Sequence, residues 1–175
     1  MTMRFATIRM NPFPLYLIVL GCCFLQEACY SFKSTSIDPS ITSFTVLPFE
    51  NRADNGPVTL AISFSEKLKD KIRRESRLKF IETDPDLTFS GNIRDFSVVS
   101  QAPTADNTSA LSRLTISVQV SFENRRDETK NWNQSFSYFQ EFDGRTNLLD
   151  IQESLVERIN NQLVEDIFNK AFGDW

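Results

Sequence analysis

The stretch LTISVQVSF (residues 114–122) decides the fold class of this chain. Leu, Ile, Val, Val and Phe occupy every second position, and Thr, Ser, Gln and Ser fill the positions between them. A strict period of two is typical of a β-strand that buries one face and leaves the other in water. We therefore predict a strand over residues 114–126 in a half-buried antiparallel sheet.

Four neighbouring segments extend this sheet. The segments 86–101 and 132–142 also alternate between apolar and polar residues, and the charged turn 124–131 joins the second of them to the central strand. These three strands are expected to form an antiparallel meander. The segments 41–51 and 78–84 are rich in β-branched and aromatic residues, and each predicts a further short strand.

In the segment 86–101 the apolar residues change parity after Ile93, which predicts a β-bulge near Arg94 and Asp95. The opposite parity of the meander carries mostly hydroxyls and amides. Such a face can dock closely against another polar wall, or it can be an ordinary solvated sheet face. Its members are Thr88, Ser90, Asn92, Arg94, Arg113, Thr115, Ser117, Gln119, Ser121, Asn133, Ser135, Ser137 and Phe139.

Two amphipathic helices complete the pattern. Apolar residues recur at intervals of three and four after Pro57 and again over residues 148–172. Asp150 and Glu153 have the spacing of a capping box at the start of the second helix. The predicted fold class is α+β: a two-layer α/β sandwich with a mostly antiparallel sheet of about four to five strands and two helices packed on one face.

The composition argues against several function classes. The chain has no histidine and a net charge of −4, so the commonest general base and the basic field that nucleic acids require are both missing. No glycine-rich phosphate loop, serine elbow or metal-ligand spacing occurs. We expect no cofactor, no metal and no nucleic-acid partner, and we interpret the chain as a binding or structural protein rather than an enzyme.

The N-terminus has the build of an export signal. Arg4 and Arg9 precede an apolar run over residues 13–25, and all three cysteines lie within or just after that run. A lone cysteine at such a junction is what bacterial lipoprotein processing uses. On local chemistry alone, Cys22 and Cys29 both remain candidates for the processing site.

Several motifs together resemble the LptE family, lipoproteins of the outer-membrane lipopolysaccharide-export machine. They are CYSF (29–32), SIDPSITSFTVLPFEN (36–51), RLTI (113–116) and LVEDIFNKA (163–171). The resemblance covers the whole chain after the signal. It implies a lipoprotein signal peptide over residues 1–28, a lipid-anchored Cys29, and a single domain over residues 29–175.

The resemblance also implies partners. LptE-like proteins sit inside the outer-membrane β-barrel LptD and help to pass lipopolysaccharide to the cell surface. Five cations are candidate contacts for lipopolysaccharide phosphates or for the partner: Arg94 near the bend, and Arg113, Arg125, Arg126 and Lys130 on or beside the hairpin. Two alternatives remain: a lipoprotein that carries or senses a lipid or glycan without a barrel, and, more weakly, a carboxylate-based hydrolase.

Overall fold

The fold is described from a computed structural model, which describes residues 37–101 and 110–173. The predicted signal peptide, Cys22 and Cys29 lie outside the described residues. The elements, in chain order, are β1 (Ser43–Val46), β2 (Glu50–Asn51), α2 (Leu60–Glu75), β3 (Lys79–Phe80), β4 (Leu87–Gln101), β5 (Leu111–Asn124), a 3-10 turn (Glu128–Lys130), β6 (Trp132–Asp143) and α3 (Leu148–Phe172).

The strands form one mixed sheet in the order β3-β1-β4-β5-β6, with β2 paired to β4. The three long strands form the predicted antiparallel meander. The short strands β1, β2 and β3 add parallel pairs at the other side of the sheet. The sheet has six strands rather than four or five, because the predicted strand 41–51 is interrupted around Pro48 and continues as the separate strand β2.

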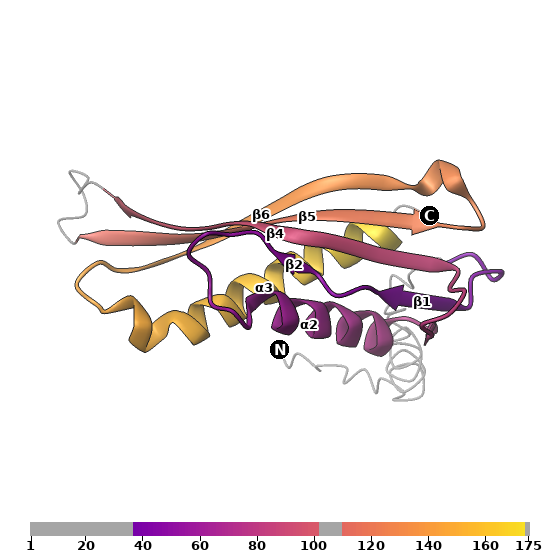
Figure 1. Ribbon diagram of the computed structural model, residues 1–175, viewed down its shortest axis with the longest axis horizontal. Helices are drawn as coiled ribbons and strands as arrows, with labels where there is room; N and C mark the ends of the chain where they lie inside the picture. Colours follow the sequence, from indigo (N-terminus) through magenta and orange to yellow (C-terminus); the bar gives the residue numbers. More distant parts are fainter. Residues whose placement is uncertain (1–36, 102–109, 174–175) are drawn as a thin grey trace, which may run out of the picture. The chain divides into compact units, whose positions relative to one another are not determined.

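Both helices lie on the same side of the sheet, as Figure 1 shows. Their apolar stripes meet the inward side chains of the strands in one core, where Phe44, Phe64, Phe89 and Phe122 are almost completely buried. The rings of Phe89 and Phe122 are 5.0 Å apart between centroids. The predicted two-layer α+β class is therefore confirmed.

The predicted bulge is also confirmed. The register of β4 against β5 shifts between Ile93 and Asp95. Before the shift Phe89 and Ile93 point into the core, and after it Phe96 does, so one extra residue keeps the apolar side chains of β4 on the helix side.

The start of α3 differs from the prediction. Asn147, not Asp150, caps the helix, because its side chain accepts a hydrogen bond from the amide of Leu149. Asp150 lies within the first turn, where a carboxylate interacts favourably with the helix dipole. The predicted capping box was therefore wrong, although the helix covers the predicted residues 148–172.

Candidate functional site

The face of the meander opposite the helices is a candidate interaction surface, and we call it the polar face. It consists of the outward side chains of β4, β5 and β6. Along β5 the burial alternates without interruption from Leu111 to Phe122. The even-numbered residues are buried and the odd-numbered residues are partly exposed, as the period of two predicted.

Short side chains of the polar face bond to one another across the strands. The Ser117 hydroxyl donates to the Ser137 hydroxyl at 2.9 Å. The Gln119 amide donates to the Asn133 side-chain oxygen. These groups are held in place by their neighbours, so a partner would meet an ordered surface with few charges rather than long mobile chains.

One cavity of about 450 Å³ opens on this face and is lined by Arg52, Asn92, Arg94 and Gln119. Both Nε and Nη2 of Arg52 donate to one Glu50 carboxylate oxygen, at 2.9 and 2.7 Å. Arg94 donates one long hydrogen bond of 3.4 Å to Gln119. Within the part of the chain that the structure describes, Arg94 forms no ion pair, so its charge is the one the cavity offers to an anion.

Arg113 lies on β5, one strand of the β5–β6 hairpin, at the end of the strand that is remote from the turn. It faces Glu141 on β6, with 2.6 Å between Nη2 and Oε1. Its guanidinium lies 4.1 Å from the centroid of the Phe139 ring. About six residues of extended strand, roughly 20 Å, separate Arg113 from Gln119 and its cavity. Arg113 and Arg94 therefore do not form one site.

Arg125 and Arg126 are engaged at the hairpin. Arg125 pairs with Asp84. Nε of Arg126 donates to Oδ1 of Asp86 at 2.7 Å. Asp86 is only 6% exposed, so this second pair ties the hairpin to the buried start of β4.

Asp86 also holds the start of β1. Its Oδ2 accepts from the amide and hydroxyl of Thr42, at 2.9 and 3.0 Å, and from the amide and hydroxyl of Ser43, at 3.1 and 2.9 Å. Burial by itself raises the pKa of Asp86. The hydrogen bonds from Thr42, Arg126 and Ser43 outweigh it and hold the pKa well below its usual range. The carboxylate is therefore a structural anion that joins three segments.

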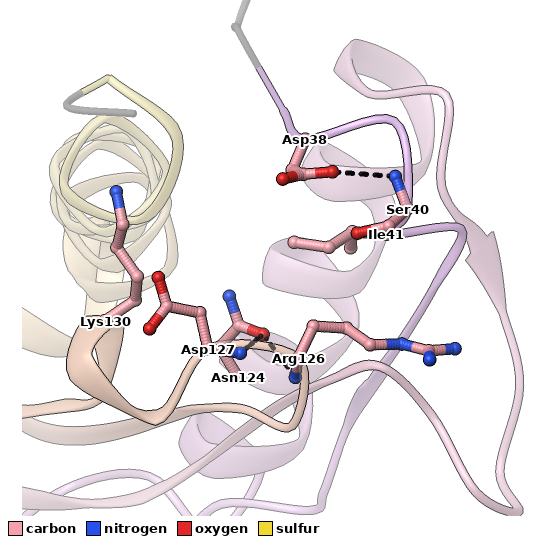
Figure 2. A pocket seen from close by; sticks show the side chains of 7 residues that line it. All are labelled: Asp38, Ser40, Ile41, Asn124, Arg126, Asp127 and Lys130. Carbon is pink, nitrogen blue, oxygen red and sulfur yellow. Dashed lines mark hydrogen bonds between the residues drawn. The ribbon is translucent and has the colours of Figure 1, made fainter.

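Beside this anion lies a second cavity, of about 400 Å³, shown in Figure 2. Asn124 forms its floor and is 1% exposed. Its Oδ1 accepts from the amides of Arg126 and Asp127 at 2.8 and 3.1 Å, whereas its Nδ2 has no hydrogen-bond partner among the described residues. Figure 2 shows the side chains of Arg126 and Lys130 extending away from each other. They line one cavity without converging on one point in it.

The five predicted cations thus fall into three places: Arg94 in the first cavity, Arg113 at the remote end of β5, and Arg125, Arg126 and Lys130 at the hairpin. Arg52 and Asp86 were not among the site residues predicted from the sequence. Arg52 reaches the first cavity because β2 pairs with β4, Asn51 opposite Ile93. Nothing local in the sequence signals that parallel pairing.

Residues 37–101 and 110–173 contain no group of three or more His, Cys, Asp or Glu side chains placed to hold a metal ion. None of the helices in those ranges is both long enough and apolar enough to cross a membrane.

Comparison with solved structures shows where this fold recurs. A minor lipoprotein from Acinetobacter baumannii matches with a TM-score of 0.51 and 10% identity, over 77% of this chain and 95% of that one. The hypothetical protein CT253 from Chlamydia trachomatis matches with a TM-score of 0.50 and 12% identity, over 77% of this chain and 99% of that one. At these identities the likeness shows a shared fold.

Sequence comparison shows the family. A search of curated proteins found no match. The family model for LptE, described as lipopolysaccharide-assembly, matches residues 41–171, which span β1 to the last turn of α3. This chain therefore belongs to the LptE family of lipopolysaccharide-assembly proteins.

Proposed function

We propose that this protein is a lipid-anchored partner of an LptD-like outer-membrane β-barrel, and that it occupies the lumen of the barrel. The observation that supports this most is the polar face. The lumen of an outer-membrane barrel is lined by polar side chains. Short hydroxyls and amides can exchange hydrogen bonds with such a wall, whereas a long charged side chain would have to be desolvated.

The proposed anchor is Cys29, released as the new N-terminus when residues 1–28 are removed. An acyl chain contributes about 0.8 kcal/mol of membrane affinity for each buried methylene. Seven residues lie between Cys29 and Ile37, where the described domain begins, so Ile37 stays within roughly 30 Å of the anchor. This reach suits a domain that enters a barrel from the periplasmic side of the outer membrane.

We propose further that the role is binding and assembly rather than catalysis. Stable permanent partners bury roughly 2,000 Å² or more. Several strands of the polar face would therefore have to take part, and no single residue of it carries the affinity.

Co-purification from outer membranes tests this proposal. The affinity-tagged full-length chain is extracted gently, and the recovered β-barrel is quantified. The double variant Ser117→Glu and Ser135→Glu places two carboxylates on the polar face, and Ser154→Glu places one on the exposed side of α3 as a control. We expect at least about a tenfold loss of barrel with the double variant and no loss with Ser154→Glu. Recovery of the wild-type chain without a barrel, or equal recovery with all variants, would refute the proposal.

A separate observation, the cavity beside Arg94, supports a second role in binding lipopolysaccharide. The cavity that Arg94 lines offers an anion site for a phosphate of lipopolysaccharide, and a barrel is not required for it. Arg94→Ala is expected to weaken binding of purified lipopolysaccharide to the isolated chain. Arg125→Ala is the control, since Arg125 pairs with Asp84. Equal binding by both variants would remove Arg94 from this role.

A further inference from the structure

The second cavity contains a buried hydrogen-bond donor that lacks an acceptor. Asn124 is 1% exposed, and its Nδ2 forms no hydrogen bond within the described residues. In Figure 2 this nitrogen points into the cavity, because Oδ1 is turned toward the amides of Arg126 and Asp127. Burying a donor without an acceptor is costly. Asn124 therefore favours an occupant of the cavity that presents an acceptor.

Two carboxylates that line the cavity each keep one oxygen unused. Oδ1 of Asp38 accepts from the Ser40 amide at 2.8 Å. Oδ1 of Asp127 accepts from the amide and the hydroxyl of Thr129, at 3.1 and 2.5 Å. Within residues 37–101 and 110–173, neither Oδ2 accepts a hydrogen bond. The hydrogen bond from the Ser40 amide lowers the pKa of Asp38 below its ordinary value, so this carboxylate is ionised at neutral pH. The cavity thus offers two acceptors beside its one donor.

The segments that line the cavity are fixed to one another. Arg77 donates to the carbonyls of Ile37 and Asp38, at 2.9 and 2.7 Å. The Asp86 carboxylate joins the start of β1 to Arg126 in the β5–β6 turn. The donor and the acceptors of the cavity are therefore held in place before a ligand arrives, which lowers the ordering cost of binding.

The lining of the cavity argues against two classes of ligand. Among the described lining residues only Ile41 is apolar, so an acyl chain would leave the polar groups unsatisfied. A phosphate bound at Nδ2 of Asn124 would be repelled by the carboxylates of Asp38 and Asp127. The two cations of the lining do not converge on one point that an anion could occupy.

We propose that this cavity binds a neutral saccharide residue. A hydroxyl is both a donor and an acceptor, so adjacent hydroxyls of one sugar can accept from Asn124 and donate to Asp38 and Asp127. The volume of about 400 Å³ lies within the range of small-molecule sites. The source of the saccharide is the sugar part of lipopolysaccharide or a free sugar, and the experiment below separates the two.

The saccharide site is compatible with a domain that occupies a barrel lumen. Asn124 has the inward, buried parity of β5, so the cavity does not belong to the polar face. A barrel wall that contacts the polar face therefore does not have to cover it. The inference rests on the proposed function only for lipopolysaccharide as a source of the sugar, and the site itself is argued from its own side chains.

Nuclear magnetic resonance of the isotope-labelled full-length chain in detergent micelles tests the site. The probes are the dephosphorylated core oligosaccharide of lipopolysaccharide, glucose and inorganic phosphate. Asp38→Asn and Asp127→Asn each keep an Oδ1 for the local hydrogen bonds and replace the unused oxygen with a donor. Asp84→Asn is the matched control, because it makes the same change outside the cavity. Far-UV circular dichroism checks that each variant is folded.

We expect the oligosaccharide to shift the amide signals of Ser40 and Asn124 in a saturable way, in the wild type and in Asp84→Asn. Asp38→Asn and Asp127→Asn should each raise the dissociation constant at least about tenfold, because a hydrogen bond to a charged group is lost. Glucose that binds as tightly as the oligosaccharide would support the site and assign it to a free sugar.

Three outcomes overturn the proposal: no saturable shift with either sugar, a shift with phosphate alone, or equal binding by the wild type and both cavity variants. The assay contains no barrel, and the oligosaccharide carries no phosphate for Arg94. A failure here therefore leaves the co-purification test and the Arg94 test unaffected, and their failure leaves this result unaffected.

Discussion

Replacing Asp86 with asparagine is expected to destabilise this fold more than any other change of a single charge. The substitution keeps the shape of the side chain and removes its charge. The amide can place its one oxygen where Oδ2 accepts from Thr42 and Ser43. Its NH₂ group then faces Nε of Arg126, which needs an acceptor. The link from the hairpin to β4 is lost, and the remaining hydrogen bonds are no longer assisted by charge.

The magnitude follows from these contacts. A hydrogen bond to a charged group contributes about 1.5–3 kcal/mol, and several bonds to one group do not add fully. Removing one partner of a buried ion pair costs about 3–5 kcal/mol. Arg126 is 59% exposed and can turn to water, which lowers the cost. We expect Asp86→Asn to lower the free energy of unfolding at pH 7 by about 3 kcal/mol.

The effect should depend on pH in one direction. The pKa of Asp86 is lower in the folded chain than its value of about 3.9 in an unfolded one. Its contribution to stability is therefore complete well above pH 4 and is lost as the pH falls below it. The difference between wild type and Asp86→Asn should shrink over that range. Arg145 hydrogen bonds lower the pKa of Asp143 to about 2, but this acts equally in both proteins.

Urea unfolding followed by far-UV circular dichroism measures these differences. Asp84→Asn is the matched control, with the same change two residues away at an exposed position. Its backbone φ of 58° suits asparagine as well as aspartate. We expect Asp84→Asn to change the free energy of unfolding by about 0.5 kcal/mol or less. A loss below about 1 kcal/mol for Asp86→Asn, or a difference from wild type that is equally large at pH 7 and pH 3, would refute the reasoning.

Three further changes follow from the packing, each measured by urea unfolding. Gly91→Ala would place a Cβ 2.0 Å from the Gln119 carbonyl oxygen, so we expect a loss of about 2 kcal/mol or more; an unchanged midpoint would contradict the close approach. Asn147→Ala removes the cap of α3 and should cost about 1 kcal/mol, more than Asp150→Ala; the reverse order would restore the capping box. Phe89→Ala empties a fully buried position and should lower the free energy of unfolding by about 3–5 kcal/mol. A loss below about 2 kcal/mol would mean that the surrounding core side chains fill the space.

Much of the fold could be predicted because it follows from local periodicity. The alternation along β5, the parity change before Asp95 in β4 and the apolar stripe of α3 each lie within one segment. The N-cap of α3 was predicted at the wrong residue. Asn147 and Asp150 both have side chains that can cap, and the path of the preceding turn decides between them.

The residues of the candidate site could be predicted from the sequence, but which of them lie close together could not. Alternation alone identified the residues of the polar face, because side chains on one strand must alternate between faces. It did not show that Arg113 lies far from the β5–β6 turn, in contact with Phe139 and Glu141, or that Arg126 is held by Asp86. Those contacts join residues far apart in the chain.

The sequence by itself determined which side of each strand faces the core, which segments are helices, and the family to which the chain belongs. These properties depend on the order of residues within short windows. Only the tertiary structure decided which charges are free to act and which are already used, and that no other strand of the described residues pairs with the outer side of β6. A charge is neutralised by side chains from distant segments, and the neighbours of a strand follow from the order of the strands in the sheet. Both are decided only when the whole sheet has formed.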